Sequence, residues 1–207
     1  NENSVFGSLL RRTTAKGKIK LTNTRVFSIQ YEKYYANGFS FQLTADKRIL
    51  SPAFNMYYTS GKFRPIFPDS PRSGPREYNV TEAAVSVRYA YKEKYVISHF
   101  NRVSLGSKYP IIELRYTKGF RINDGVLKSD FNYHKYTVSV SQQVNIAPFG
   151  SVSYIIDGGI VSSVLPVVLL NVAKGNDTYY YNRYAFNNMN RYEFVSDRFA
   201  SVMIEHR

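Results

Sequence analysis

The stretch that decides the fold is residues 25–46, which read RVFSIQYEKYYANGFSFQLTAD. Apolar and polar side chains alternate through it, with a break at the Asn-Gly pair in the middle. The apolar members are Phe27, Ile29, Tyr31, Phe39, Phe41 and Leu43. Alternation with a period of two is typical of a β-strand that has one apolar and one polar face. The stretch therefore predicts two antiparallel strands joined by a turn.

The length of that turn follows from the pairing of the two strands. A turn over residues 36–38 pairs Tyr31 with Leu43 and keeps the apolar side chains on one face. A turn of two residues would instead pair Tyr31 with Thr44, on the polar face. Because a shift by one residue moves every side chain to the other face, the pattern predicts the three-residue turn, with Gly38 in the left-handed conformation.

The same period recurs in residues 83–92, 112–117, 136–141 and 151–157. The apolar side chains of these runs include Val85, Val87, Tyr89, Ile112, Leu114, Tyr116, Val138, Val140, Val152, Tyr154 and Ile156. No segment has a sustained helical period, so the expected fold class is all-β and antiparallel, with about eight to ten strands. Long irregular segments are expected at about 60–79 and 173–177, and residues 92–108 are expected to form a loop or a hairpin tip.

Composition restricts the chemistry. The chain has 28 Lys and Arg against 15 Asp and Glu, a formal net charge of +13, and no cysteine. The absence of cysteine excludes disulfides, thiolate zinc sites and thiol catalysis. The positive charge predicts an anionic neighbour such as nucleic acid, a membrane surface or an acidic glycolipid. Residues 160–170 form the most apolar stretch, and its serines and Pro166 argue against a membrane-spanning helix.

Two all-β architectures fit the alternation. In a soluble sandwich the apolar faces point into a core, whereas in a transmembrane β-barrel they point outward to lipid and the polar faces line the lumen. The runs are about nine to twelve residues long, which suits a strand that crosses a bilayer. Tyr and Phe lie toward the ends of the runs, and charges of both signs lie on the polar faces. We therefore expect a transmembrane barrel, with the apolar residues given above facing lipid.

Two charged sets are candidates for function. The first is expected to form a network in the lumen, either as ion pairs that stiffen the wall or as a docking surface for a plug, a loop or a periplasmic partner. Its members are Arg88, Glu113, Arg115, Glu193, Asp197, Arg198 and Glu205. The second is a basic loop suited to the phosphates of lipopolysaccharide or, more simply, to solvent. Its members are Lys62, Arg64, Arg72 and Arg76.

Other chemistries find less support in the sequence. His99, His134 and His206 are far apart and lack a second ligand at metal spacing, so no metal or other cofactor is expected. Ser98 precedes His99 directly, and an extended chain points the two to opposite faces, so no enzymatic activity is expected. Nucleic-acid grooves place aromatic and basic residues on the same face, and here they lie on opposite faces.

Three stretches carry a family resemblance: VRYAYKEK at 87–94, LGSKYPIIELRYTKG at 105–119, and FNNMNRYEFVSDRFA at 186–200 with IEH at 204–206. Together they resemble the Bacteroidota outer-membrane β-barrel family of carboxypeptidase-regulatory-like proteins with a C-terminal domain of unknown function. The resemblance implies a membrane barrel preceded by a regulatory-like sandwich in the periplasm. Residues 1–207 do not contain that module, and we expect the sequence as given to stop at Arg207 inside a strand.

We therefore expect residues 1–207 to be one outer-membrane barrel segment that is incomplete at both ends, the C-terminal half of a barrel of about fourteen to sixteen strands. The expected function is non-enzymatic, either a solute passage or a scaffold in a transport or assembly complex. Expected partners are outer-membrane lipid, lipopolysaccharide and other outer-membrane or periplasmic proteins, and not nucleic acid. The alternatives are a soluble all-β module that binds an anionic polymer and an outer-membrane hydrolase.

Overall fold

The computed structural model describes residues 22–52, 77–97, 102–190 and 193–207. These residues form an all-β structure, as the alternation predicts. The strands are β1 Thr22–Tyr34, β2 Phe39–Pro52, β3 Tyr78–Ala90, β4 Lys94–Ile97, β5 Arg102–Gly106, β6 Ile111–Phe120, β7 Tyr133–Asn145, β8 Ser151–Val161, β9 Asn171–Val172, β10 Val195–Ser196 and β11 Arg198–His206. The single 3-10 helix of the described residues, η1, spans Val167–Leu169. No helix in these ranges is long and apolar enough to cross a membrane.

The chain divides into two compact units. The sheet unit comprises residues 26–48, 79–163 and 197–207, and the second unit comprises residues 1–25, 49–78 and 164–196. In the described part of the second unit, β9 pairs with β10. The buried amide of Asn176 organises the loop that follows, because it donates to Tyr180 O at 2.6 Å and to Asn187 Oδ1 at 2.8 Å.

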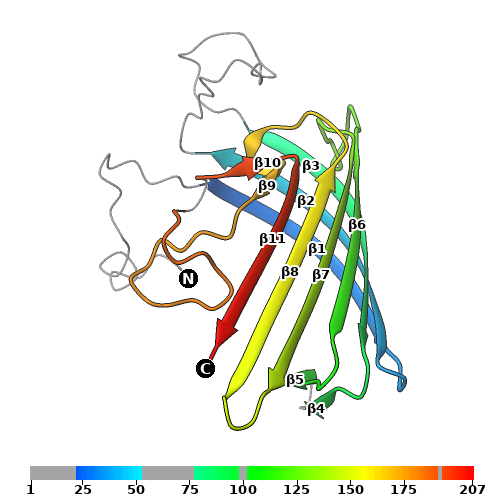
Figure 1. Ribbon diagram of the computed structural model, residues 1–207. Coiled ribbons are helices and arrows are strands. Elements are labelled where there is room, and N and C mark those ends of the chain that lie inside the picture. Colours follow the sequence, from blue (N-terminus) through cyan, green and yellow to red (C-terminus); the bar gives the residue numbers. More distant parts are fainter. Residues whose placement is uncertain (1–21, 53–76, 98–101, 191–192) are drawn as a thin grey trace. The chain divides into compact units, whose positions relative to one another are not determined.

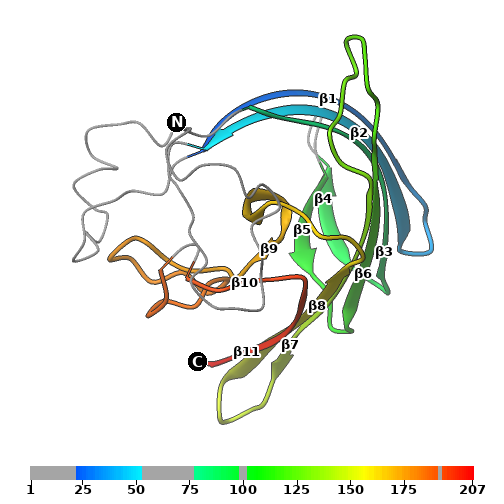
Figure 2. The ribbon, with the colours of Figure 1, turned by 90° about the horizontal axis from the view of Figure 1, so that it is seen from above.

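Seven strands form one curved sheet in the order β1-β2-β3-β6-β7-β8-β11 (Figures 1 and 2). The pairs β3–β6, β6–β7, β7–β8 and β8–β11 are all antiparallel, which confirms the predicted strand direction. Within the described residues the sheet does not close on itself, because β1 and β11 stand at its two ends. A closed barrel is therefore not formed by these strands alone.

The turn between β1 and β2 has the predicted length. Tyr35 N donates to Phe39 O at 2.9 Å, and Gly38 has a φ of +83°. Gly38 is also needed for packing, because a Cβ there would lie 2.3 Å from Ala90 O. A second short turn joins β7, which ends at Asn145, to β8, which begins at Ser151, and in it Ile146 N donates to Gly150 O at 2.7 Å.

The connections at the other end of the sheet are longer. The β6–β7 loop, residues 121–132, folds against β3, where Asn79 N donates to Asp130 Oδ2 at 2.9 Å and Asp130 N donates to Asn79 O at 3.0 Å. Thr81 N donates to Ser129 Oγ, which is fully buried. Residues 53–76, with most of the predicted irregular segment, lie outside the described residues.

Residues 92–108, predicted as a loop or a hairpin tip, contain the antiparallel hairpin β4–β5. This hairpin is a separate two-stranded sheet. It lies on the concave side of the seven-stranded sheet (Figure 2).

Glycines on the sheet make room for aromatic rings of the neighbouring strand. Gly119 pairs with Tyr133, and a Cβ on Gly119 would lie 2.3 Å from the Tyr133 ring. Gly159 pairs with Phe199, and a Cβ there would lie 2.5 Å from that ring. Each ring thus lies across a glycine, and this packing is available only where the facing residue has no side chain.

The close approach at Gly119 predicts a stability difference between two alanine variants. Gly119→Ala should destabilise the fold by roughly 1–3 kcal/mol, because Tyr133 is buried and cannot move away from the added methyl group. Gly158→Ala is the control, since its Cβ would have an ordinary contact of 3.4 Å to Val138 Cγ1. Urea unfolding of the full-length protein measures both, and equal midpoints would contradict the packing.

Candidate functional site

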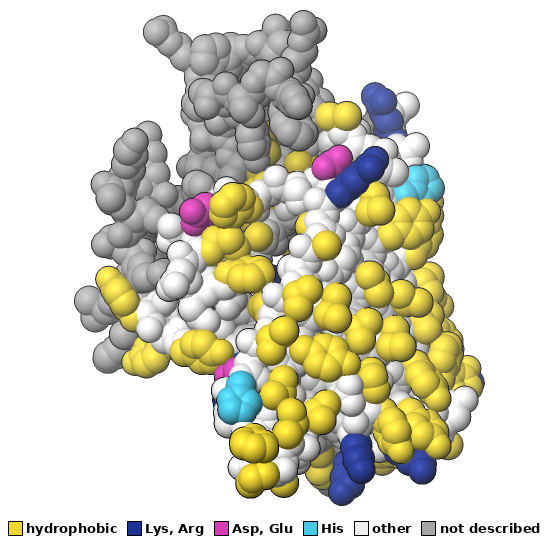
Figure 3. All heavy atoms as spheres, in the orientation of Figure 1, with side chains coloured by type: hydrophobic (Ala, Val, Ile, Leu, Met, Phe, Trp, Pro, Cys, Tyr) yellow, Lys and Arg dark blue, Asp and Glu magenta, His cyan; other side chains and the backbone are white. Residues whose placement is uncertain are grey.

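The seven-stranded sheet has an apolar and a polar face. The register aligns Val87 with Leu114, Leu114 with Val138, and Val140 with Ile156, so the apolar residues of β3, β6, β7 and β8 share one face. None of the seventeen side chains predicted to face lipid is buried, and Phe27 and Leu114 are 67% and 51% exposed. Figure 3 shows the hydrophobic side chains gathered over this sheet. We refer to this surface as the apolar face.

The apolar face extends further than the sequence predictions. Ile156 pairs with Val202 and Tyr154 with Ile204, which places both β11 residues on it. Val202 and Ile204 are 58% and 71% exposed. Exposed and partly buried residues alternate along the whole of β11, but its sequence RFASVMIEH places apolar residues at both parities, so the pattern did not indicate these two.

The opposite surface, the polar face, is where residues are buried. Along the middle of the strands its buried members are small or polar, and they include Ser40, Thr44, Glu82, Ala84, Thr117, Ser153 and Asp157. Asp157 accepts a hydrogen bond from Ser139 Oγ at 2.6 Å. At the strand ends that carry the longer connections, the same face also buries Val80, Tyr133 and Val161. Over the middle of the sheet, polar residues are therefore buried and apolar ones exposed, the reverse of a sheet that packs an apolar core in water.

Arg88 connects three elements at the short-turn end of the polar face. Its Nε donates to Glu113 Oε1 at 3.1 Å, across the β3–β6 pair. Its Nη1 donates to Glu93 Oε2 at 2.8 Å, and Nη2 donates to the other oxygen of Glu93. The Glu93 side chain is 2% exposed and the Glu113 side chain is 55% exposed. The predicted charge network included both Arg88 and Glu113, without naming them as a pair, and it did not include Glu93.

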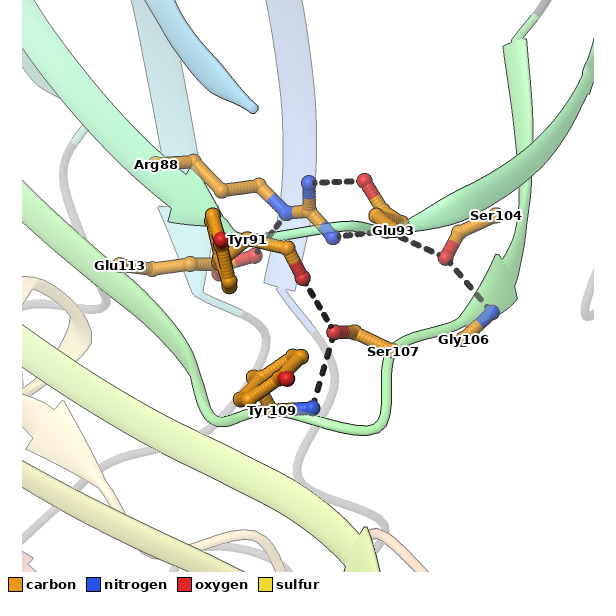
Figure 4. Close-up of polar contacts among 8 residues, drawn as sticks. All are labelled: Arg88, Tyr91, Glu93, Ser104, Gly106, Ser107, Tyr109 and Glu113. Atoms are coloured by element: carbon orange, nitrogen blue, oxygen red, sulfur yellow. Dashed lines mark hydrogen bonds and ion pairs between the residues drawn. The ribbon is translucent and has the colours of Figure 1, made fainter. Parts of the chain in front are cut away.

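Glu93 also fixes the β4–β5 hairpin (Figure 4). Ser104 Oγ on β5 donates to Glu93 Oε1, and Gly106 N donates to Ser104 Oγ at 3.1 Å. We call Arg88, Glu93, Ser104 and Glu113 the Arg88 cluster. Its single cation is shared between two carboxylates, which anchors the hairpin to the sheet.

A second cluster lies on the same face near the ends of the strands that carry the longer connections. Arg48 Nη2 donates to Glu82 Oε1, and the Tyr133 hydroxyl donates to Glu82 Oε2. Glu82 pairs with Gly119, so it is the glycine that lets Tyr133 reach this carboxylate across β6. Lys135 lies close enough to interact electrostatically with Glu82, Arg48 and Arg115. The sequence prediction did not include Arg48, Glu82, Tyr133 or Lys135.

The other charged residues predicted for the lumen lie apart from one another. Arg115 donates to Ser86 Oγ at 3.4 Å, and Glu205 pairs with Arg207 at 2.8 Å. Arg198 pairs with Ile160, which is 50% exposed, so the register places Arg198 on the apolar face. Glu193 belongs to the second unit, where it accepts a hydrogen bond from Asn190 N at 2.8 Å. Asp197 O accepts from Val161 N.

The structure offers no metal site within the described ranges, where no three potential ligands gather. His134 Nδ1 is 2.8 Å from the Tyr116 hydroxyl, and His206 Nε2 is 2.7 Å from Phe149 O. Asp197 and His206 flank opposite ends of β11, which separates them by about 30 Å of extended chain. Ser98, His99 and the predicted lipopolysaccharide residues Lys62, Arg64, Arg72 and Arg76 lie outside the described residues.

Glu93 and Glu113 differ in burial, which predicts that removing their carboxylates has unequal effects on stability. Glu93→Ala should cost about 2 kcal/mol, because Arg88 loses two hydrogen bonds and the hairpin loses its anchor. Glu113→Ala removes an exposed partner of the same arginine and should cost less than about 1 kcal/mol. Hydrogen exchange of residues 91–97 and 102–110 measures the effect, and faster exchange in the Glu113 variant than in the Glu93 variant would contradict this assignment.

The comparisons with known proteins identify a family. The model of the family of unknown function DUF5686, C-terminal domain, matches residues 6–207. No match was found among curated proteins or among solved structures. The match confirms the expected membership of a family with a C-terminal domain of unknown function. The chain therefore belongs to the DUF5686 family, and it corresponds to the C-terminal domain of that family.

Proposed function

We propose that the seven-stranded sheet is part of the wall of a transmembrane β-barrel in a bacterial outer membrane, and that its polar face lines an aqueous passage for solutes. One observation carries the proposal: the sheet exposes Val, Ile, Leu, Phe and Tyr along one face and, over the middle of the strands, buries Ser, Thr, Asp and Glu on the other. An outer-membrane barrel needs this distribution, because its outer surface meets lipid and its inner surface meets water.

The lengths of the strands agree with this proposal. A strand that crosses a bilayer at a tilt needs about 9–11 residues. β6 has 10 residues, β8 has 11 and β11 has 9, and all three lie within the continuous sheet. Strands of soluble sheets average about five to six residues.

Aromatic pairs lie toward both ends of the apolar face, where membrane barrels carry girdles at the two interfaces. Tyr116 and Tyr136 pair near one end, with ring centroids 5.0 Å apart. Tyr35 and Phe39 flank the turn at the other end, with ring centroids 5.8 Å apart. The apolar residues between these levels would meet the acyl chains.

The turns suggest an orientation. Residues 35–38 and 146–150 are short connections at one end of the sheet, which also carries residues 91–110 with the β4–β5 hairpin. The connections of residues 121–132 and 162–197 join strands at the opposite end, and neither short turn lies there. Outer-membrane barrels have short turns on the periplasmic side and longer loops outside. We therefore assign the Arg88 cluster and the β4–β5 hairpin to the periplasmic side.

The open edges of the sheet require more strands. An unpaired edge is not tolerated in lipid, because its backbone N–H and C=O groups would have no hydrogen-bond partners. We propose that strands outside the described residues pair with β1 and β11, giving a barrel of about fourteen to sixteen strands in all. The resemblance to Bacteroidota outer-membrane barrels supports the same assignment. The role is non-enzymatic, with outer-membrane lipid and lipopolysaccharide as partners.

Cell fractionation and conductance test the proposal together. The full-length protein should remain in the outer membrane after an alkaline wash, dissolve in detergent, and produce ion conductance in planar lipid bilayers. A soluble module for an anionic polymer would be released by the wash and bind single-stranded nucleic acid. Release by the wash, or retention without conductance, would contradict the passage.

Two residues on β7 test which face meets lipid. Val138→Lys should disrupt assembly, at a cost of about 2–4 kcal/mol if the residue lies near the bilayer midplane. Gln143→Lys should assemble normally, because Gln143 is exposed and lies on the polar side of the same strand. In a water-soluble protein Val138, which is 41% exposed, would accept lysine at little cost. Heat-resistant migration in gels measures assembly, and normal assembly of the Val138 variant would contradict the facing.

A further inference from the structure

Three cations gather on the polar face around one carboxylate. Arg48 on β2, Arg115 on β6 and Lys135 on β7 come from three strands, and Lys135 interacts electrostatically with Glu82 and with both arginines. We call Arg48, Arg115 and Lys135 the basic cluster. Strand pairing fixes its shape, because Lys135 pairs with Thr117, two residues along β6 from Arg115 on the same face.

The carboxylate of Glu82 does not neutralise the basic cluster. Its two oxygens already accept hydrogen bonds from Arg48 and from the Tyr133 hydroxyl. Lys135 makes no hydrogen bond or ion pair with any described residue, and Arg115 Nη1 makes a long hydrogen bond of 3.4 Å to the neutral Ser86 Oγ. The cluster therefore carries two positive charges in excess of its one carboxylate.

Hydrogen-bonding groups around the same cluster also lack partners. Arg48 Nε and Thr44 Oγ1 are buried and make no hydrogen bond in the described structure. Thr44 and Arg48 lie four residues apart on β2, so they share the polar face. Buried donors without partners are rare in folded proteins, and they often mark a place where a ligand or water completes the hydrogen bonding.

We propose that the basic cluster is an anion-binding site that takes small solutes bearing an oxyanion, such as phosphate or carboxylate. Guanidinium groups match the geometry of such oxygens, and Lys135 adds a point charge beside them. The inference rests on the proposed function, because the site would lie on the wall of the passage. It would make the passage prefer anions over cations.

The Arg88 cluster on the same face is a contrast within the molecule. There a single arginine is shared by two carboxylates, and Glu93 is almost fully buried by its partners. That cluster has no excess of positive charge, and its donors are already used. The charge balance thus distinguishes an anion site in the basic cluster from a structural anchor in the Arg88 cluster.

Conductance of the full-length protein in planar bilayers under a KCl gradient tests the site. The reversal potential should show a preference for chloride, and inorganic phosphate should reduce the current. Lys135→Gln, and further the Lys135→Gln Arg115→Gln double variant, should lower the anion-to-cation permeability ratio several-fold and weaken the effect of phosphate. Lys108→Gln is the control, because it removes the same charge from an exposed residue in the turn before β6.

The outcomes separate this inference from the proposed function. A conducting protein without anion preference, or with a preference that the Lys135 variant retains, would overturn the anion site and leave the passage intact. If the wild type does not conduct, line broadening of inorganic phosphate in ³¹P NMR, with the full-length protein in detergent, decides the matter. Broadening lost in Lys135→Gln and kept in Lys108→Gln would support the site without a passage, and its absence from the wild type would overturn the site.

Discussion

The structure depends on the hydrogen bonding of seven strands into one curved antiparallel sheet, because that ladder fixes which side chains share a face. Side chains on the concave side of a curved sheet converge, so the space for each is small. The polar face meets this constraint with Ala84, Ser139, Gly159 and other small residues, and with rings that lie across glycines. Most of the bulky Val, Ile and Leu side chains of the sheet occupy the opposite face, and Val80 and Val161 are buried on the polar face only near strand ends.

Crowding on the polar face also determines how its charges are held. A carboxylate that is buried among neighbouring strands is stable only when hydrogen-bond donors surround it. Glu93 is held by Arg88 and Ser104, and Glu82 by Arg48 and Tyr133. Both arrangements join strands or hairpins that are separated in sequence, so they stiffen the sheet. The two arrangements differ in charge balance. Around Glu93 the donors of Arg88 are all used, whereas around Glu82 the Nε of Arg48 has no hydrogen-bond partner among the described residues.

The sequence was sufficient for features that depend on local pattern. Alternation and the one-residue shift argument predicted the three-residue turn at Gly38 and the antiparallel strands. They also predicted that Val87, Leu114 and Val138 lie on the same face of the sheet. The pairing of Arg88 with Glu113 could be inferred from the sequence, because each lies on the polar face of a predicted strand. The face on which Arg198 lies could not be inferred, because it depends on β11 beginning directly after Asp197 and on the pairing of β11 with β8.

The buried contacts could not be derived from local pattern, because they depend on which distant segments meet. In the sequence Glu93 lies in a segment expected to be a loop or a hairpin tip. Only the fold of the β4–β5 hairpin places Ser104 beside it. Glu82 and Tyr133 are fifty-one residues apart, and their contact requires both the pairing of β3, β6 and β7 and a glycine between them. Gly119 is the one local signal, since a glycine within a strand indicates that a neighbouring group comes close.

Alternation alone does not distinguish a soluble sandwich from a membrane wall, because the two have the same period and opposite surroundings. The two differ in which face of each strand is buried, and β1, at one end of the sheet, illustrates the difference. Along β1 from Asn23 onward every residue is exposed, on the polar as well as the apolar face, whereas β3 alternates buried and exposed residues within the same sheet. Among the described strands β1 stands at one end of the order, and its polar residues, such as Ser28 and Glu32, are exposed. A further strand paired with β1 would flank both of its faces, and on the concave side, where side chains converge, it would cover Ser28 and Glu32 more than it covers Phe27 and Ile29. Closure into a barrel would supply such a strand.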